Sequence, residues 1–128
     1  MTALRVSPTG THFLAGDEPR FLLADTVWAA FTRPTTHEWE QLVRLRRRQG
    51  FTAVNISVLP IPHDRTGAGQ DRSPFATDAT GIPDLDRLDP GYFERARAMT
   101  AIAVQAGLVP VLVVLWCNYV PGTWGAEI

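Results

Sequence analysis

Aromatic and polar side chains follow the apolar segments of this chain, at the point where each segment ends. Asp25 and Trp28 come after the apolar residues 21–24, and Trp116 comes after residues 108–115. Flat aromatic rings can stack against the C–H faces of sugars, while carboxylate and amide groups can bind sugar hydroxyls. The chemistry that these residues could do together is carbohydrate binding. The predicted ligand residues are Asp25, Trp28, Asn55, Trp116, Asn118 and Tyr119.

Each of these residues also has a structural explanation. A tryptophan is more often part of a core than of a ligand platform, and Asp25 could cap a helical turn that starts near Thr26. Asn55 stands inside an apolar segment, where a buried amide has to find hydrogen-bond partners. The shared position at the ends of strands favours a common site for Asp25, Trp28, Trp116, Asn118 and Tyr119. Asn55, inside a strand, could point toward the same ligand face or serve the structure alone.

A capping box predicts the first helix that positions these segments. Thr35 and Glu38 have the spacing of that motif, and Gly50 predicts the end of the helix in a left-handed turn. Residues 51–59 then predict a strand, because they are rich in β-branched side chains.

The same plan occurs a second time. Asp89 and Pro90 predict another helix start, Gly107 predicts its end, and residues 108–115 predict another apolar strand. The segments QGFTAVNISVL and AGLVPVLVVLW therefore share the order helix, glycine and buried strand. Strands that are buried on both faces and separated by helices predict parallel pairing and an α/β fold.

The predicted organisation is a single domain with two unusual parts. Residues 1–20 predict a β-hairpin, because short extended pieces alternate with glycine and proline. Residues 21–128 predict three β/α units with two main helices, including an aperiodic loop at 60–88. Loops of that length inside a domain are usually functional or disordered.

Composition excludes several classes of partner. The 128 residues carry a net charge of -1, which gives no reason to expect nucleic acid or an acidic membrane surface. The longest apolar run, residues 107–117, is shorter than the roughly 20 residues that span a bilayer. With one cysteine, Cys117, and no signal-like N-terminus, a cytoplasmic protein is expected.

No metal and no cofactor are expected from the sequence. His63 and Asp64 lack the spacing of a zinc motif. Gly67 and Gly69 lack the third glycine of a dinucleotide-binding fingerprint.

The order of the segments resembles the N-terminal part of the apiosidase-like glycoside hydrolases, which comprise glycoside hydrolase family 140 and its uncharacterised relatives. The resemblance covers nearly the whole chain and is carried by FLLADTVWAAF, THEWEQLVRLRRRQGF, NISVL, DPGYFERARAMTAIAVQAGL and VLVVLWCNYVPGTWG. It implies a (β/α)₈ TIM barrel, which takes about 250 residues. The chain is therefore predicted to be the N-terminal part of such a barrel.

The resemblance also implies a function. The family hydrolyses glycosidic bonds with two carboxylates, generally from later strands, so no catalytic residue is assigned here and the chain alone is expected to be inactive. Asp25, Trp28 and Trp116 match positions that line the substrate cleft. The apolar edge at 108–115 predicts self-association. The alternatives are a non-catalytic carbohydrate-binding or interaction module and a nonfunctional remnant.

Overall fold

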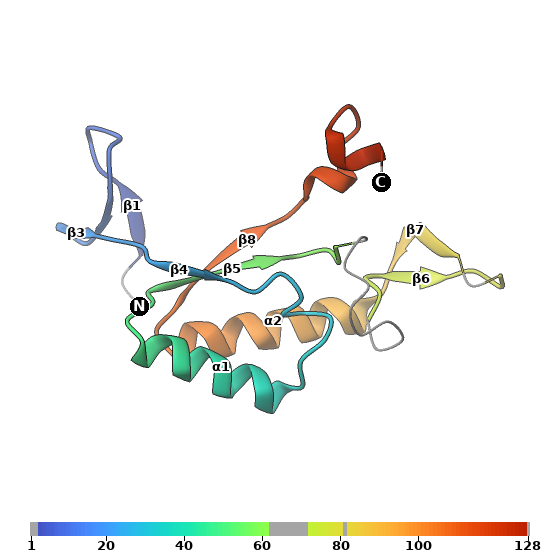
Figure 1. Ribbon diagram of the computed structural model, residues 1–128, viewed down its shortest axis with the longest axis horizontal. Helices are drawn as coiled ribbons and strands as arrows, with labels where there is room; N and C mark the ends of the chain where they lie inside the picture. Colours follow the sequence, from blue (N-terminus) through green and yellow to red (C-terminus); the bar gives the residue numbers. More distant parts are fainter. Residues whose placement is uncertain (1–2, 62–71, 81, 128) are drawn as a thin grey trace.

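The computed structural model describes residues 3–61, 72–80 and 82–127 of the chain. A three-stranded parallel sheet in the order β4-β5-β8 lies at its centre, and helices α1 and α2 cover one face of this sheet (Figure 1). The predicted α/β class is confirmed. The described elements are β1 (Leu4–Val6), β2 (Phe13–Ala15), β3 (Glu18–Arg20), β4 (Ala24–Thr26), α1 (Thr36–Arg48), β5 (Ala53–Ser57), β6 (Phe75–Thr77), β7 (Pro83–Leu88), α2 (Pro90–Gln105), β8 (Val109–Val113) and the 3₁₀ turns η1 (Cys117–Tyr119) and η2 (Trp124–Glu127).

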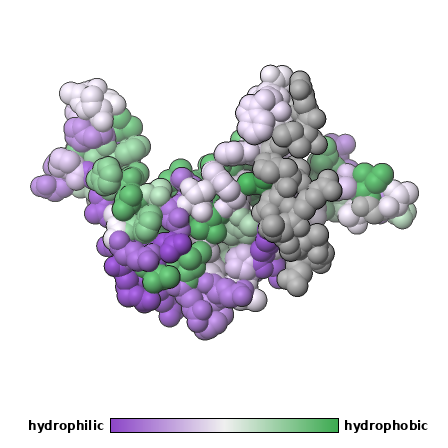
Figure 2. All heavy atoms as spheres, viewed as in Figure 1, coloured by the Kyte–Doolittle hydropathy of each residue, from purple (hydrophilic) through white to green (hydrophobic). Residues whose placement is uncertain are grey.

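Two arms rise from the ends of the sheet on the side away from the helices. The N-terminal arm, residues 3–20, is a three-stranded antiparallel sheet in the order β1-β2-β3, which extends the predicted hairpin by one strand. The C-terminal arm, residues 114–127, carries η1 and η2. Figure 2 shows the molecular surface hollowed between the two arms. The hollow lies over the face of the sheet that bears no helix.

The first parallel strand starts later than the sequence pattern predicts. A strand buried on both faces is expected at residues 21–24, but Phe21 is 79% exposed and Leu23 is 43% exposed. Leu23 instead joins the start of β5 through Thr52, because its N–H donates to Thr52 Oγ1 at 2.8 Å and its carbonyl accepts from the N–H of Thr52. Asp25 consequently lies within the strand and not in the loop after it.

The helix ends are made by the local signals that the sequence contains. Thr35 Oγ1 accepts from the backbone N–H of Glu38 at 3.2 Å, and Glu38 Oε2 accepts from the N–H of Thr35 at 2.7 Å, which confirms the capping box. At the second helix, Asp89 Oδ1 accepts from the N–H of Gly91 at 2.7 Å. These bonds satisfy backbone donors that have no partner inside a helix.

Two glycines make the joints between helix and strand. Gly50 and Gly107 have φ values of +92° and +85°, which L side chains rarely adopt. At Gly107 an added Cβ would lie 3.2 Å from Nε of Arg47, so a side chain there would also be crowded. The predicted repetition of helix, glycine and strand is confirmed.

The strand register decides which side chains face the helices. Val54 and Ile56 belong to the core that the helices cover. Side chains alternate across a strand, so Asn55 faces the opposite side, toward the hollow. Asp25 is the register partner of Val54, and Thr26 is the partner of Asn55.

The core between sheet and helices is completed by side chains from both helices. Trp39 of α1 is fully buried, and its Nε1–H donates to the carbonyl of Met99 in α2 at 2.8 Å. This bond links two helices across sixty residues of sequence. Since a buried indole N–H needs an acceptor, the bond also fixes the rotation of α1 against α2.

Part of the region predicted as one long loop forms a β-hairpin. Strands β6 and β7 pair in antiparallel fashion, with Phe75 opposite Leu88. The N–H of Asp89 donates to the carbonyl of Pro74 at 2.9 Å, which joins the hairpin to the start of α2. His63, Asp64, Gly67 and Gly69 lie outside the described residues.

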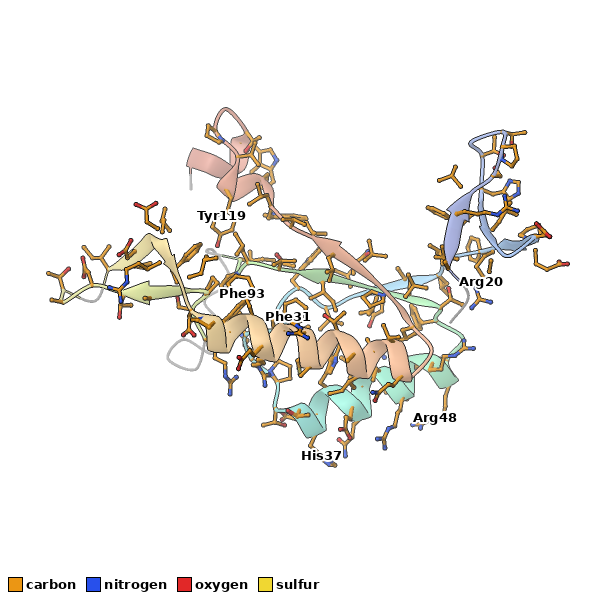
Figure 3. The ribbon with its side chains drawn as sticks, turned by 180° about the vertical axis from the view of Figure 1, so that it is seen from behind. Arg20, Phe31, His37, Arg48, Phe93 and Tyr119 are labelled. Carbon is orange, nitrogen blue, oxygen red and sulfur yellow. The ribbon has the colours of Figure 1, made fainter. Side chains whose placement is uncertain are left out.

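An apolar groove of about 710 Å³ lies along α2 beside β8. Its lining includes Phe93, Val104 and Leu112, and Figure 3 shows Phe93 on α2. Leu112 is 45% exposed, and β8 is an edge strand of the parallel sheet.

Neither helix of the described residues is long and apolar enough to cross a membrane.

Candidate functional site

The carboxyl ends of β4, β5 and β8 lie together because the three strands are parallel neighbours. In parallel α/β folds this end of the sheet carries the ligand site. We call it the strand-end rim. It includes Trp28 after β4, Asn55 in the middle of β5 and level with the last residue of β4, and the C-terminal arm after β8.

Two tryptophans meet across the end of the central strand. The ring centroids of Trp28 and Trp116 are 4.7 Å apart, with an angle of 54° between the ring planes. Since β4 and β8 flank β5, the pair spans the sheet at this point. Tilted aromatic contacts of this kind contribute about 0.5–1.5 kcal/mol beyond the area that they bury. Both indoles remain partly exposed, so the pair can present aromatic surface to a ligand.

Trp116 also carries an unused donor. Its Nε1 atom is buried and has no hydrogen-bond partner among the residues that the structure describes. A buried donor without an acceptor costs about 1–3 kcal/mol. An acceptor brought to this position would therefore stabilise the ring in its place.

Tyr119 lies at the rim, but its hydroxyl is occupied. The hydroxyl donates to the carbonyl of Pro60 at 2.7 Å, and Tyr92 of α2 donates to the carbonyl of Val58 at 2.7 Å. Figure 3 shows Tyr119 on the C-terminal arm. Together the two tyrosines hold the segment that leaves β5. Tyr92 was not among the predicted site residues, because nothing in its local sequence indicates a bond to a carbonyl 34 residues away.

Burial has an electrostatic consequence for both tyrosines. It raises the pKa of the Tyr119 hydroxyl, since the charged phenolate loses hydration. Burial also raises the pKa of Tyr92, and the neighbouring Tyr119 adds to that effect. Both hydroxyls therefore remain protonated donors to a higher pH than an ordinary tyrosine, whose pKa is about 10.

Asn55 contributes an amide to the face that the hollow covers. Its Nδ2 lies 3.5 Å from Oγ1 of Thr26, which is long for a hydrogen bond. The backbone carbonyl of Asn55 accepts from the N–H of Val27 at 2.9 Å and so continues the ladder between β4 and β5. The amide thus retains capacity for a further partner.

Asp25 lies on the helix side of the sheet, away from this amide. Its Oδ2 accepts from Nε of Arg46 at 2.5 Å, and the two side chains are 23% and 30% exposed. Arg46 stands in the last turn of α1. The structure therefore pairs Asp25 with the helix layer and does not bring it together with Trp28 and Asn55. Its predicted role as a sugar ligand stays a prediction.

The remaining predicted residue belongs to the C-terminal arm. Asn118 is the middle residue of η1, but its side chain lies outside the described part of the structure. Of the six predicted residues, the structure places Trp28, Asn55, Trp116 and Tyr119 at the strand-end rim.

Comparison with solved structures defines the class of fold. The chain matches a glycoside hydrolase with a TM-score of 0.65 and 18% identity, over 90% of this chain and 26% of that one. It matches a glycoside hydrolase from Bacteroides vulgatus with a TM-score of 0.66 and 23% identity, over 95% of this chain and 25% of the other. A family 5 glycoside hydrolase from the same organism matches with a TM-score of 0.64 and 18% identity, over 90% of this chain and 25% of that one. The fold is the N-terminal part of a (β/α)₈ barrel, and the chain spans about a quarter of the length of these proteins.

The family follows from a direct match to its sequence profile. Residues 8–128 match the family described as "Apiosidase-like, catalytic domain". The chain belongs to the apiosidase-like family, which confirms the resemblance read from its segments. No curated protein matches the chain.

Proposed function

We propose that the chain is the N-terminal part of a glycoside hydrolase that binds a carbohydrate at the strand-end rim. The observation that carries this proposal is the Trp28–Trp116 pair, which joins the ends of β4 and β8 above the end of β5. Family membership supports it independently. The expected ligand is an oligosaccharide or a fragment of a plant polysaccharide.

The roles of the rim residues follow from their chemistry. Trp28 and Trp116 offer aromatic surface for the C–H face of a sugar ring, and the amides of Asn55 and Asn118 would bind hydroxyls. The phenol ring of Tyr119 adds aromatic surface, while its hydroxyl holds the carbonyl of Pro60. Asp25 enters the proposal either as a further ligand or as the partner of Arg46 alone, and these two roles predict different experimental results.

Glycoside hydrolysis requires two carboxylates at a defined separation. We place them in barrel strands beyond the three that this chain contains, because the chain matches only about a quarter of the similar hydrolases. The chain alone is then expected to bind sugar without cleaving it.

Calorimetric titration with a panel of pectic and other plant oligosaccharides tests the binding step. Trp28→Ala and Trp116→Ala should each abolish or strongly weaken the heat of binding. Phe21→Ala is the matched control, because Phe21 is an aromatic residue that is 79% exposed and precedes β4, away from the rim. An absence of binding by the unmodified chain would refute the proposal. So would a loss of binding heat in Phe21→Ala as large as in the two tryptophan variants.

A turnover assay separates the proposal from its alternative. A longer polypeptide that contains the complete barrel should hydrolyse an aryl glycoside or a pectic oligosaccharide. If that polypeptide binds sugar and cleaves none of them, the rim belongs to a non-catalytic carbohydrate-binding or interaction module. Cleavage by the 128-residue chain alone would show that the catalytic carboxylates lie within it.

The uncovered edge of the sheet supports a second partner for the chain in isolation. Strand β8 presents an unpaired edge, and the apolar groove along α2 lies beside it. Exposed apolar edges favour association, so we propose that the isolated chain self-associates through β8 and α2.

A further inference from the structure

Two arginines hold the segment that follows β4. Arg95 of α2 donates from Nε to the carbonyl of Phe31 at 3.1 Å and from Nη2 to the carbonyl of Pro34. Arg72 donates from Nη1 to the carbonyl of Thr32 at 3.3 Å. The segment at residues 27–34 is therefore held through three of its carbonyl groups, two bound by α2 and one by the residue that lies just before β6.

These carbonyls depend on the arginines because the segment uses its own donors elsewhere. The N–H of Ala30 donates to the carbonyl of Val27, and the N–H groups of Thr32 and Arg33 donate to the carbonyl of Ala29. Phe31 is only 1% exposed and Thr32 only 4%. A buried carbonyl without a donor costs about 1–3 kcal/mol, so the arginines supply bonds that the turns cannot supply.

The shape of Arg95 suits this task. A guanidinium presents several donors in a fixed plane, whereas an ammonium is a compact point charge on a flexible stem. Arg95 therefore bridges two carbonyls three residues apart in sequence. Within the described residues it forms no ion pair with a carboxylate. Its burial, followed by the charge of Arg72, lowers the pKa of its guanidinium.

Trp28 stands between two anchors of this segment. On one side, the N–H of Val27 joins the ladder to Asn55 at 2.9 Å. On the other side, Phe31 is fixed by its buried side chain and by Arg95, and Figure 3 shows Phe31 beside α2. The position of the Trp28 ring against Trp116 thus depends on how the whole segment is held.

We infer that Arg95 is the positioning residue for Trp28: it fixes residues 27–34 against α2 and thereby holds the Trp28 ring in contact with Trp116. The consequence for sugar binding rests on the proposed function. The consequence for the tryptophan pair does not, because it follows from hydrogen bonds inside the chain.

Circular dichroism gives a readout of the pair itself. Two indole rings 4.7 Å apart and tilted by 54° should produce an exciton couplet. Trp28→Phe defines the spectrum without the couplet. Arg95→Gln should lose the couplet as completely as Trp28→Phe does, at a temperature where its far-ultraviolet spectrum is still that of the folded chain. Arg95→Lys should not restore it, because one ammonium cannot reproduce the two-carbonyl bridge.

Arg97→Gln is the matched control. Arg97 lies two residues further along α2, is exposed, and makes no hydrogen bond or ion pair with the described residues. It should keep the couplet. If Arg95→Gln does not fold, Arg72→Gln, which removes only the bond to Thr32, should reduce the couplet without abolishing it.

Three results would overturn the inference. One is a folded Arg95→Gln chain with a lower unfolding temperature and an intact couplet, which would make Arg95 merely structural. Another is an Arg95→Lys chain with the full couplet. The third is a loss of the couplet in Arg97→Gln as large as the loss in Arg95→Gln. Loss of the couplet in Arg95→Gln, combined with no sugar binding by the unmodified chain, would support the positioning role and refute the proposed function.

Discussion

Replacement of Asp25 by asparagine separates its two candidate roles. The structure pairs the Asp25 carboxylate with Arg46 at 2.5 Å on the helix side of the sheet, whereas the sequence pattern predicts a sugar ligand. Asparagine keeps the size of the side chain and removes its charge. If the carboxylate serves the ion pair, the substitution lowers the stability of the chain and leaves its affinity for sugar unchanged.

The expected size of the stability change follows from the geometry of the pair. A hydrogen bond to a charged group contributes about 1.5–3 kcal/mol. Asp25 and Arg46 are 23% and 30% exposed, so solvent screening reduces that value. We therefore expect Asp25→Asn to reduce the free energy of unfolding by about 1–2 kcal/mol. Arg46→Gln should have a similar effect, and the double variant should lose little more than either single one.

Urea unfolding followed by far-ultraviolet circular dichroism measures these changes, at one protein concentration for all variants. The pair of Arg44 and Glu40 is the control, because its side chains are 65% and 36% exposed and it lies on the surface of α1. Glu40→Gln should cost only about 0.2–0.5 kcal/mol. Additive losses in the Asp25 and Arg46 double variant would refute the ion-pair reasoning. A sugar affinity that falls in Asp25→Asn but not in Arg46→Gln would support the ligand role.

Three further predictions concern titration and association. Both tyrosines of the chain, Tyr92 and Tyr119, have raised pKa values, so spectrophotometric titration should show little phenolate at the ordinary tyrosine pKa of about 10. The stability that the two hydroxyls contribute is present below that pH and is lost as the pH rises through their folded pKa values. Titration of the folded chain with the ordinary tyrosine pKa would contradict this prediction. The bonds to Thr35 lower the pKa of Glu38, so the stability that the Glu38 carboxylate contributes is present above its unfolded pKa and is lost as the pH falls through its folded pKa. Glu38→Gln should flatten this acid dependence of the unfolding midpoint. An unchanged pH profile in that variant would count against the capping argument. Leu112→Glu should shift the isolated chain toward the monomer in size-exclusion chromatography, whereas Phe21→Glu at the other end of the sheet should not; a sharp monomer peak for the unmodified chain would remove the basis for self-association.

The local features of the fold could be predicted from the sequence because short-range chemistry produces them. Thr35 and Glu38 form their capping box within three residues of each other. Gly50 and Gly107 end the two helices because no other residue adopts their backbone angles easily. These signals establish the repeated unit and hence the α/β class.

The features that could not be predicted depend on contacts between distant residues. Asp25 and Arg46 are 21 residues apart, and nothing in either local sequence indicates that they pair. The side of the sheet that Asp25 faces follows from its register with Val54, which only the folded sheet defines. The bond between Arg95 and the carbonyl of Phe31 spans 64 residues, and no local sequence pattern predicts it. The aromatic character of the rim was predictable, but the way it is held in place was not.

The position of β5 between β4 and β8 has a consequence for the newly synthesised chain. Ala53 of β5 pairs with Val109 of β8, which the ribosome adds 56 residues later. At about 5–20 residues per second this interval lasts about 3–11 s. Throughout that time the apolar central strand has a partner on one edge only, and for most of it Trp39 also lacks the carbonyl of Met99. The nascent chain therefore passes through a state in which its central strand is open to chaperones and to other nascent chains, and this state ends only when β8 has emerged.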